Sequence, residues 1–280
     1  MSGRQEASTP LTDRKAAWAS RLRAVILENL PAVIFFTLVI LGVELATKYL
    51  GLIPKYLVPA PSAVLQEMLS SSSSLLRHTG VTLTEILVGY AAGIVLGFAG
   101  ALAIFYSRLL QRIIYPVVLL SQFVPKLAIA PLLIVWFGFS ITPKVLVTAL
   151  ICMFPITINA LAGLKASDPR HLDFMHTINA TRWQVFFKIR LPAAVPHVFA
   201  GLKVGITLAT IGALVAEWIS SEAGLGYLIV FALGFFRIEQ LFAALVMITL
   251  VGLLLYVLVV ILEKLLAPHQ RSVKNVVETV

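Results

Sequence analysis

Residues 164–192 read LKASDPRHLDFMHTINATRWQVFFKIRLP and connect two long apolar stretches of the chain. Within this connection, Ser167 and Asp168 precede Pro169, so a capping side chain is followed by proline in the first helical turn. We therefore predict a short helix that begins at Pro169 and ends near Ile178. Such a connection is folded and is not a flexible linker.

A second short helix is predicted after a tight turn. Asn179 interrupts the first helix, and asparagine is one of the few residues other than glycine that tolerate the left-handed conformation. Thr181 can cap a helix over about 182–189, and Leu191 and Pro192 are expected to end it and to begin the next apolar stretch. The predicted helix–turn–helix carries apolar residues that face both ways: Phe174, Met175, Trp183, Phe186 and Phe187.

Two interpretations of this helix–turn–helix are open from the residues alone. The two helices can lie on lipid headgroups, with Trp183 and Lys188 at the membrane interface. Alternatively, they can insert as a knob into the groove of a partner protein.

The rest of the chain is apolar enough to lie in a membrane. Of the 280 residues, 59% are hydrophobic and 12% are charged, whereas a soluble domain carries about 25% charged residues. A membrane helix needs about 20 apolar residues. Six stretches meet this length or nearly do: 31–50, 81–106, 114–139, 145–164, 193–219 and 241–265. Pro125 and Pro131 interrupt the third, so we expect a kinked or discontinuous helix there.

The net charge of +9 is distributed as a membrane orientation predicts. With the N-terminus in the cytoplasm, fifteen of the 22 Lys and Arg residues fall in cytoplasmic segments and five in outer segments. We therefore expect both termini in the cytoplasm and no nucleic-acid partner. The predicted organisation is a cytoplasmic tail (1–30), a transmembrane domain (31–265) that contains the loop 165–192, and a second cytoplasmic tail (266–280).

The stretch DFMHTINATRWQVFFKIRLPAAVPHVFAGLK (173–203) resembles the "EAA" loop of permease subunits of bacterial ABC importers. In that family, Glu-Ala-Ala is followed after three residues by Gly, and about nine residues later by Ile-x-Leu-Pro. The ending is matched here by Ile189, Leu191 and Pro192. The other positions depart from the pattern: Asp173, Phe174 and Met175 stand at the triplet, and Asn179 stands at the glycine.

Three further segments resemble one subgroup of that family. They are LVPAPSAVLQEM (57–68), VPKLAIAPLLIVWFGFS (124–140) and VAEWISSEAGLGYLI (215–229). The subgroup imports sulfonates, taurine, nitrate and pyrimidine vitamin precursors. The resemblance covers residues 57–263 and implies an all-α membrane protein of the type I (MetI-like) ABC importer permease architecture, with six transmembrane helices and a cytoplasmic coupling helix–turn–helix.

The resemblance also implies the partners of the chain. They are two ATP-binding subunits, a second permease copy (usually as a homodimer), an extracytoplasmic substrate-binding protein and the lipid bilayer of the bacterial inner membrane. The sequence contains no G-x-x-x-x-G-K-[ST] motif, so we expect ATP and Mg²⁺ on the partner subunit, no cofactor in this chain and no enzyme activity of its own. The residues expected to couple to the ATP-binding subunit are Asp173, Phe174, Met175, Asn179, Arg182, Trp183, Ile189, Leu191 and Pro192.

Polar residues within the spans are costly and suggest a translocation path or internal pairs. We expect Glu44 and Glu217, near span ends, to pair or to reach the headgroups. For Lys203, the alternative to a path role is pairing with Glu85. The candidate path residues are Gln122, Lys126, Lys203 and Glu85. The glycines at 89, 93, 97 and 100 lie along one helix face, where we expect close helix packing.

The leading functional interpretation is therefore an importer permease for a small solute. The solute is expected to be a sulfonate-, taurine- or nitrate-like anion, or a pyrimidine-type precursor. The alternative is a single-chain secondary transporter, in which we would expect internal repeats and broken helices in matching halves. The helix–turn–helix favours the importer, because a secondary transporter needs no docking loop.

Overall fold

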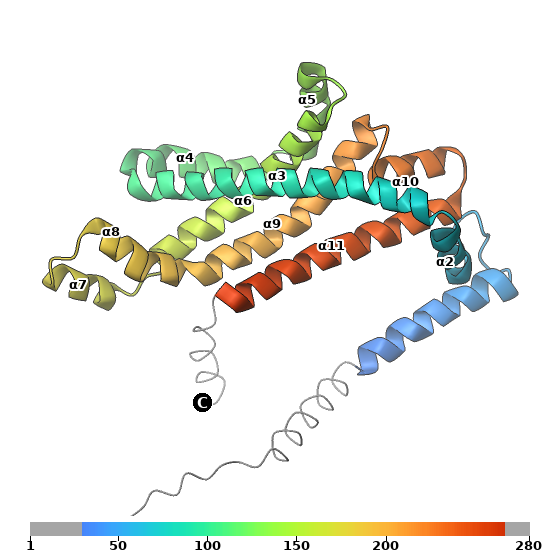
Figure 1. The fold of residues 1–280 in the computed structure, drawn as a ribbon, viewed down its shortest axis with the longest axis horizontal. Helices are drawn as coiled ribbons and strands as arrows, with labels where there is room; N and C mark the ends of the chain where they lie inside the picture. The colour runs from blue at the N-terminus through green and yellow to red at the C-terminus, as the bar shows by residue number, and fades with distance from the viewer. Residues whose placement is uncertain (1–29, 267–280) are drawn as a thin grey trace, which may run out of the picture. The chain divides into compact units, whose positions relative to one another are not determined.

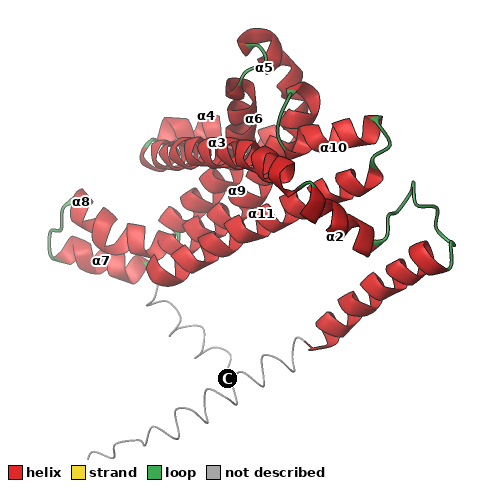
Figure 2. Ribbon diagram, turned by 45° about the vertical axis from the view of Figure 1, so that its right-hand side comes forward, coloured by secondary structure: helices red, strands yellow, loops and turns green. Residues whose placement is uncertain are grey.

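The computed structural model describes residues 30–266, and all of the secondary structure described there is helical (Figure 2). The all-α membrane class is confirmed. Within this range, five helices are long and apolar enough to cross a membrane: Leu30–Tyr49, Ser72–Tyr106, Ile141–Lys165, Arg182–Ile219 and Ile238–Leu266. Most of the predicted N-terminal tail and all but the start of the C-terminal tail lie outside the described residues. The chain divides into two compact units, residues 1–65 and 66–280.

In the first unit, the long helix Leu30–Tyr49 is followed by the start of α2 (Pro61–Ser70). The Glu44 carboxylate accepts hydrogen bonds from the backbone N–H of Ser62 (2.9 Å) and from its hydroxyl (2.7 Å). Lys48 lies 3.3 Å from the same carboxylate. The prediction that Glu44 pairs is confirmed by Lys48, and the carboxylate also binds a backbone N–H at the N-terminus of α2, which has no partner within that helix.

In the second unit, three long helices form the core. Helix α6 (Ile141–Lys165) packs against both α3 (Ser72–Tyr106) and α9 (Leu191–Ser220). Helix α11 (Ile238–Leu266) packs against α9 and against the short helix α10 (Leu225–Gly234) (Figure 1).

Small residues allow α6 to approach both neighbours closely. A Cβ atom added at Gly97 of α3 would lie 2.8 Å from the carbonyl oxygen of Met153. On the other side of α6, a Cβ atom at Gly163 would lie 2.9 Å from Cα of Ala194 on α9. The predicted packing role of the glycines on α3 is confirmed at positions 89, 93 and 97, whereas a Cβ atom at 100 would meet only ordinary contacts.

The expected third span is not a continuous helix. It consists of α4 (Arg108–Leu120), two 3₁₀ turns (Ser121–Phe123 and Lys126–Ile129) and α5 (Ala130–Phe137). Val124 adopts an extended conformation because the following residue, Pro125, disfavours the helical one. The predicted discontinuity is confirmed, and the expectation of six membrane helices becomes five long helices and one broken segment.

The predicted helix–turn–helix lies at one end of the second unit. It comprises α7 (Pro169–Thr177), α8 (Arg182–Val185) and a π-helical turn, η4 (Phe186–Arg190). Helix α10 lies at the opposite end of α9 (Figures 1 and 2). We call these the loop end and the α10 end.

Candidate functional site

Local signals in the sequence position α7 as predicted. The Asp168 carboxylate accepts a hydrogen bond from the backbone N–H of Arg170 (2.8 Å), and Pro169 occupies the first turn. Asn179 adopts the left-handed conformation with φ +51°. The N–H of Ala180 then donates to the Met175 carbonyl (2.9 Å), which closes the turn between the two helices.

Helix α8 begins with a reciprocal cap. The Thr181 hydroxyl accepts from the backbone N–H of Gln184 (3.3 Å), and the Gln184 side chain accepts from the backbone N–H of Thr181 (2.8 Å). The predicted cap is confirmed, but the predicted end of this helix at Leu191 and Pro192 is wrong. The chain stays helical from α8 through η4 into α9.

The physical reason lies in the turn before Pro192. A proline in a regular α-helix clashes with the carbonyl four residues earlier and donates no hydrogen bond to it. Here the turn widens, and the N–H of Leu191 donates to the carbonyl of Phe186, five residues earlier. The wider turn accommodates Pro192 without breaking the helix.

The helix–turn–helix exposes four large apolar side chains. They are more than half exposed, with Phe174 at 63% and Trp183 at 72%, and we call them the apolar loop face: Phe174, Ile178, Trp183 and Phe187. The rings of Trp183 and Phe187 stack with centroids 5.8 Å apart. Such a patch is typical of a protein or membrane contact.

Other predicted coupling residues do not belong to this face. Met175 was expected beside Phe174 on the docking side, but it is only 6% exposed, because its position on α7 faces the interior. Asp173 and Arg182 are exposed, whereas Ile189 and Leu191 are half-buried. Phe186 is buried with Leu164 of α6 and Ala194 of α9, and this cluster anchors the loop to the long helices.

At the α10 end, a buried ion pair joins two of the core helices. The ammonium of Lys144 on α6 donates to Glu85 Oε1 on α3 (2.7 Å) and to the hydroxyl of Ser221 (2.8 Å). The Ser221 hydroxyl in turn donates to the carbonyl of Ala223. Ser221 directly follows α9, so the network connects α3, α6 and the end of α9.

A second buried carboxylate holds the turn between α9 and α10. Glu217 accepts from the hydroxyl of Thr82 (2.6 Å) and from the backbone N–H of Gly226 (2.5 Å). The N–H of Leu225 donates to the same Thr82 hydroxyl (2.7 Å), and the N–H of Gly224 donates to Nδ1 of His78 (3.0 Å). Helix α3 therefore binds the first N–H groups of α10 through its own side chains.

Glycine is required at this turn. Gly224 has φ +113°, a conformation that residues with a side chain rarely adopt, and a Cβ atom added there would overlap the Glu217 carboxylate. Glu217 is buried within the protein, and its partners are hydrogen-bond donors and not a cation, so the expectation that it reaches the headgroups is wrong. The sequence analysis did not identify Thr82, His78 and Lys144 as partners at this end of the molecule. The sequence signal that could have indicated these contacts was an acidic residue in an apolar stretch, seven residues before Gly224-x-Gly226.

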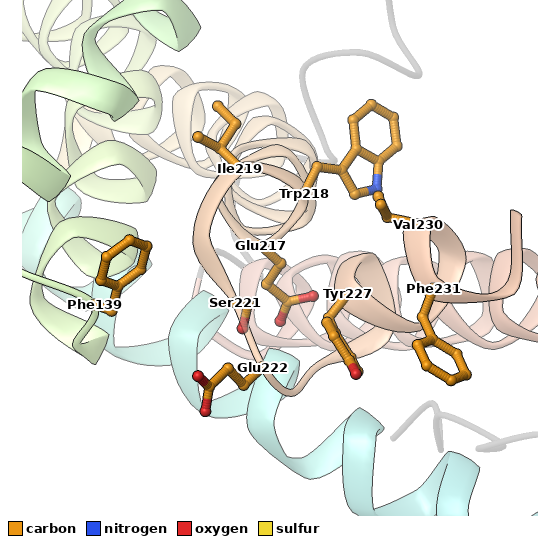
Figure 3. A pocket seen from close by; sticks show the side chains of 9 residues that line it. All are labelled: Phe139, Glu217, Trp218, Ile219, Ser221, Glu222, Tyr227, Val230 and Phe231. Atoms are coloured by element: carbon orange, nitrogen blue, oxygen red, sulfur yellow. The ribbon is translucent and has the colours of Figure 1, made fainter. Parts of the chain in front are cut away.

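A cavity of about 310 Å³ opens beside this network (Figure 3). Its lining combines aromatic side chains with two carboxylates and contains no Lys or Arg among the described residues: Phe139, Glu217, Trp218, Ile219, Ser221, Glu222, Tyr227, Val230 and Phe231. Pockets of this size accommodate small organic molecules, and aromatic walls favour planar ones.

Residues 89–272 match the family described as "Binding-protein-dependent transport system inner membrane component". This match covers more than half of the chain, including the loop end and the α10 end. The chain belongs to this family. It is therefore a permease component of the ABC transporter type, and the predicted resemblance is confirmed.

Two curated relatives place the permease near the predicted subgroup. The formylaminopyrimidine transport permease protein ThiX of Halalkalibacterium halodurans is 34% identical over 246 residues, covering 88% of this chain and 98% of that protein. The taurine transport system permease protein TauC of Escherichia coli is 28% identical over 243 residues, covering 84% of this chain and 88% of that protein.

A solved structure shows the same fold. A chain of the MetNI methionine ABC transporter, from a structure of its inward-facing conformations, aligns with a TM-score of 0.57 at 18% identity. The alignment covers 70% of the permease and 97% of that chain. The predicted type I architecture is confirmed.

Three of the four predicted path residues of the permease have separate partners in the structure. Lys203 of α9 pairs with Glu263 of α11 (2.8 Å), so the alternative in which it pairs with Glu85 is wrong. Glu85 pairs with Lys144. Lys126 lies over the ring of Phe154, 4.7 Å from its centroid. The side chain of Gln122 lies outside what the structure describes.

Proposed function

We propose that the permease forms the translocation path of an ATP-driven importer and that its apolar loop face docks into a separate ATP-binding subunit. The observation that carries this proposal is the exposure of Phe174 and Trp183 on a folded loop that continues as one helix into α9. An amphipathic helix whose apolar face is unpartnered suits a hydrophobic groove of another protein. Movement of that partner would then reach α9 directly.

The assembly we propose contains two ATP-binding subunits, two permease copies and an extracytoplasmic binding protein that delivers the solute. ATP and Mg²⁺ belong to the ATP-binding subunits. The excess of Lys and Arg in the loop and in both tails supports a cytoplasmic location of these segments in the inner membrane. The α10 end would then lie on the outer side, where the solute arrives.

For the solute, the cavity at the α10 end favours one of the two expected classes. Among the described residues, two carboxylates and no Lys or Arg line it, and the nearby Lys144 ammonium is already paired with Glu85, which disfavours a sulfonate- or nitrate-like anion. Aromatic walls suit a neutral or basic planar ring. The higher identity to the formylaminopyrimidine permease than to the taurine permease agrees with this choice. We therefore propose a pyrimidine-type solute.

Affinity purification tests the docking proposal. The tagged permease, purified from its native membrane in a mild detergent, should bring down an ATP-binding subunit in about equal amount. Phe174→Asp should abolish this association, because a carboxylate placed in an apolar groove is costly to desolvate.

His176→Asp is the matched control for this substitution. It adds the same charge to α7 two residues further on, which is on the opposite side of the helix. Association that survives Phe174→Asp would contradict the docking proposal. A permease that is purified alone and still moves solute without ATP would support the secondary-transporter alternative.

A further inference from the structure

The side chain of Arg190 contacts the ends of two core helices at the loop end. Its Nη1 donates to the carbonyl of Leu164 (3.2 Å), in the last turn of α6. Its guanidinium carbon lies 4.8 Å from the ring centroid of Phe105, in the last turn of α3. Arg190 itself is the last residue of η4 and directly precedes α9. One side chain therefore joins α3, α6 and the start of α9.

Both contacts are favourable for physical reasons. The last carbonyl groups of a helix have no partner within the helix, and a cation there also interacts well with the helix dipole. Lys165, the last residue of α6, lies instead over the ring of Tyr115 on α4, 5.7 Å from its centroid. Arg190 is thus the basic residue that supplies a donor to the end of α6, and its planar group can stack on Phe105 at the same time.

The π-helical turn places Arg190 for these contacts. A π turn adds one residue to the helix, and each residue corresponds to about 100° of rotation. Without the added residue, Arg190 and the first residues of α9 would be rotated by about 100° about the helix axis relative to the loop. The same turn buries Phe186 in the cluster with Leu164 and Ala194, and Phe105 packs against that cluster. The contacts of Arg190 and Phe186 therefore depend on the same local geometry.

We propose that Arg190 is a positioning residue that transmits movement of the apolar loop face to the ends of α3 and α6 as well as to α9. The proposal rests on the docking function stated above. With Arg190 present, displacement of the loop moves three helix ends together. Without it, the loop and α9 can shift while α3 and α6 stay behind, so ATP hydrolysis continues with less transport.

The test uses the whole assembly, with ATP-binding subunits and binding protein, reconstituted in proteoliposomes. It measures solute taken up per ATP hydrolysed. Arg190→Ala should keep the ATP-binding subunit bound and should lower this ratio on the order of tenfold, within the usual range of coupling between sites. Arg190→Lys keeps a donor and the charge but loses the planar stacking group, and should recover part of the ratio.

Lys188→Ala is the matched control, because Lys188 is an exposed basic residue in the same π turn. It should leave uptake per ATP unchanged. Phe105→Leu keeps an apolar side chain while removing the ring, and provides a second variant in case Arg190→Ala does not assemble. Phe105→Leu should also lower the uptake per ATP. The double variant Phe105→Leu, Arg190→Lys should lower it little further than either single variant, because both changes remove the same stacking contact.

An unchanged ratio in both Arg190→Ala and Phe105→Leu, with normal assembly, would overturn the proposal for Arg190. That result would leave the docking proposal intact. Failure of docking itself would appear separately, as an ATP-binding subunit that remains bound to the Phe174→Asp variant. Equal losses in Arg190→Lys and Arg190→Ala, together with a lowered thermal midpoint of the assembly, would indicate a merely structural role.

Discussion

The ammonium of Lys144 lies 2.7 Å from the carboxylate of Glu85, and both side chains are almost completely buried. They belong to different core helices, α6 and α3, and the hydroxyl of Ser221 accepts a further hydrogen bond from the same ammonium. The pair therefore fixes the relative position of α3, α6 and the end of α9 near the cavity.

Removing one partner of this pair should be strongly destabilising. Lys144→Met leaves the Glu85 carboxylate buried without its cation, and we expect a loss of about 3–5 kcal/mol in the free energy of unfolding. The double variant Lys144→Met, Glu85→Gln should recover a large part of this loss, because no uncompensated charge remains. Thermal unfolding of the purified permease in detergent measures both. Lys264→Met, at an exposed position of α11, is the control, and a loss at Lys144 no larger than that of the control would contradict the prediction.

A methyl group at Gly226 should weaken the turn between α9 and α10. A Cβ atom there would lie 2.5 Å from the Leu214 carbonyl oxygen and 2.8 Å from Cβ of Glu217. We expect Gly226→Ala to cost about 1–3 kcal/mol, as overpacking does in other cores. Gly234→Ala, in the same short helix, meets nothing within 4 Å and should be nearly neutral. Unfolding midpoints of the two variants test this contrast, and equal midpoints would show that the turn can relax.

The effect of replacing Asn179 should depend on whether the new residue tolerates the left-handed backbone conformation. Asn179→Gly should be tolerated, because glycine adopts φ +51° without strain. Asn179→Val should impair association with the ATP-binding subunit, because a β-branched residue in the left-handed region is strained by about 1–2 kcal/mol or more and would distort the turn between α7 and α8. Co-purification of the subunit is the readout. Equal recovery with valine and glycine would show that the turn conformation does not matter for docking.

Lys203 offers a separate test of the translocation path. Lys203→Arg keeps the ion pair with Glu263, whereas Lys203→Ala removes it, so we expect uptake to fall further with alanine than with arginine. The effect on stability should be small, about 0–1 kcal/mol, because both side chains are a quarter exposed. Uptake and unfolding are measured on the same preparations. Equal uptake by the two variants would show that transport does not depend on this ion pair.

The parts of the site that could be predicted from the sequence are those set by neighbours along the chain. Asp168 before Pro169, Asn179 at the turn and Thr181 three residues before Gln184 each act within one helical turn, and the structure confirms all three. The long apolar stretches predicted the membrane class for the same reason, since length and hydropathy are local properties.

The parts that could not be predicted depend on how the helices are rotated and paired. Lys144 is 59 residues from Glu85, and nothing local indicates that they meet. For Lys203 the sequence suggested Glu85, whereas the packing of α11 against α9 places Glu263 beside it. The burial of Met175 was also missed, because it depends on how α7 is rotated. The continuous helix through Pro192 was missed because it depends on the π turn.

The continuous helix from Arg182 to Ile219 can act as a rigid lever arm that connects the loop end to the α10 end. Its 38 residues correspond to a length of about 57 Å, so a tilt of about 5° at one end displaces the other by about 5 Å. The far end of this lever carries Glu217, to which the turn leading into α10 is bound. A small tilt at the loop would therefore displace Glu217, which lines the cavity, together with the turn bound to it, and no hinge within the helix is required.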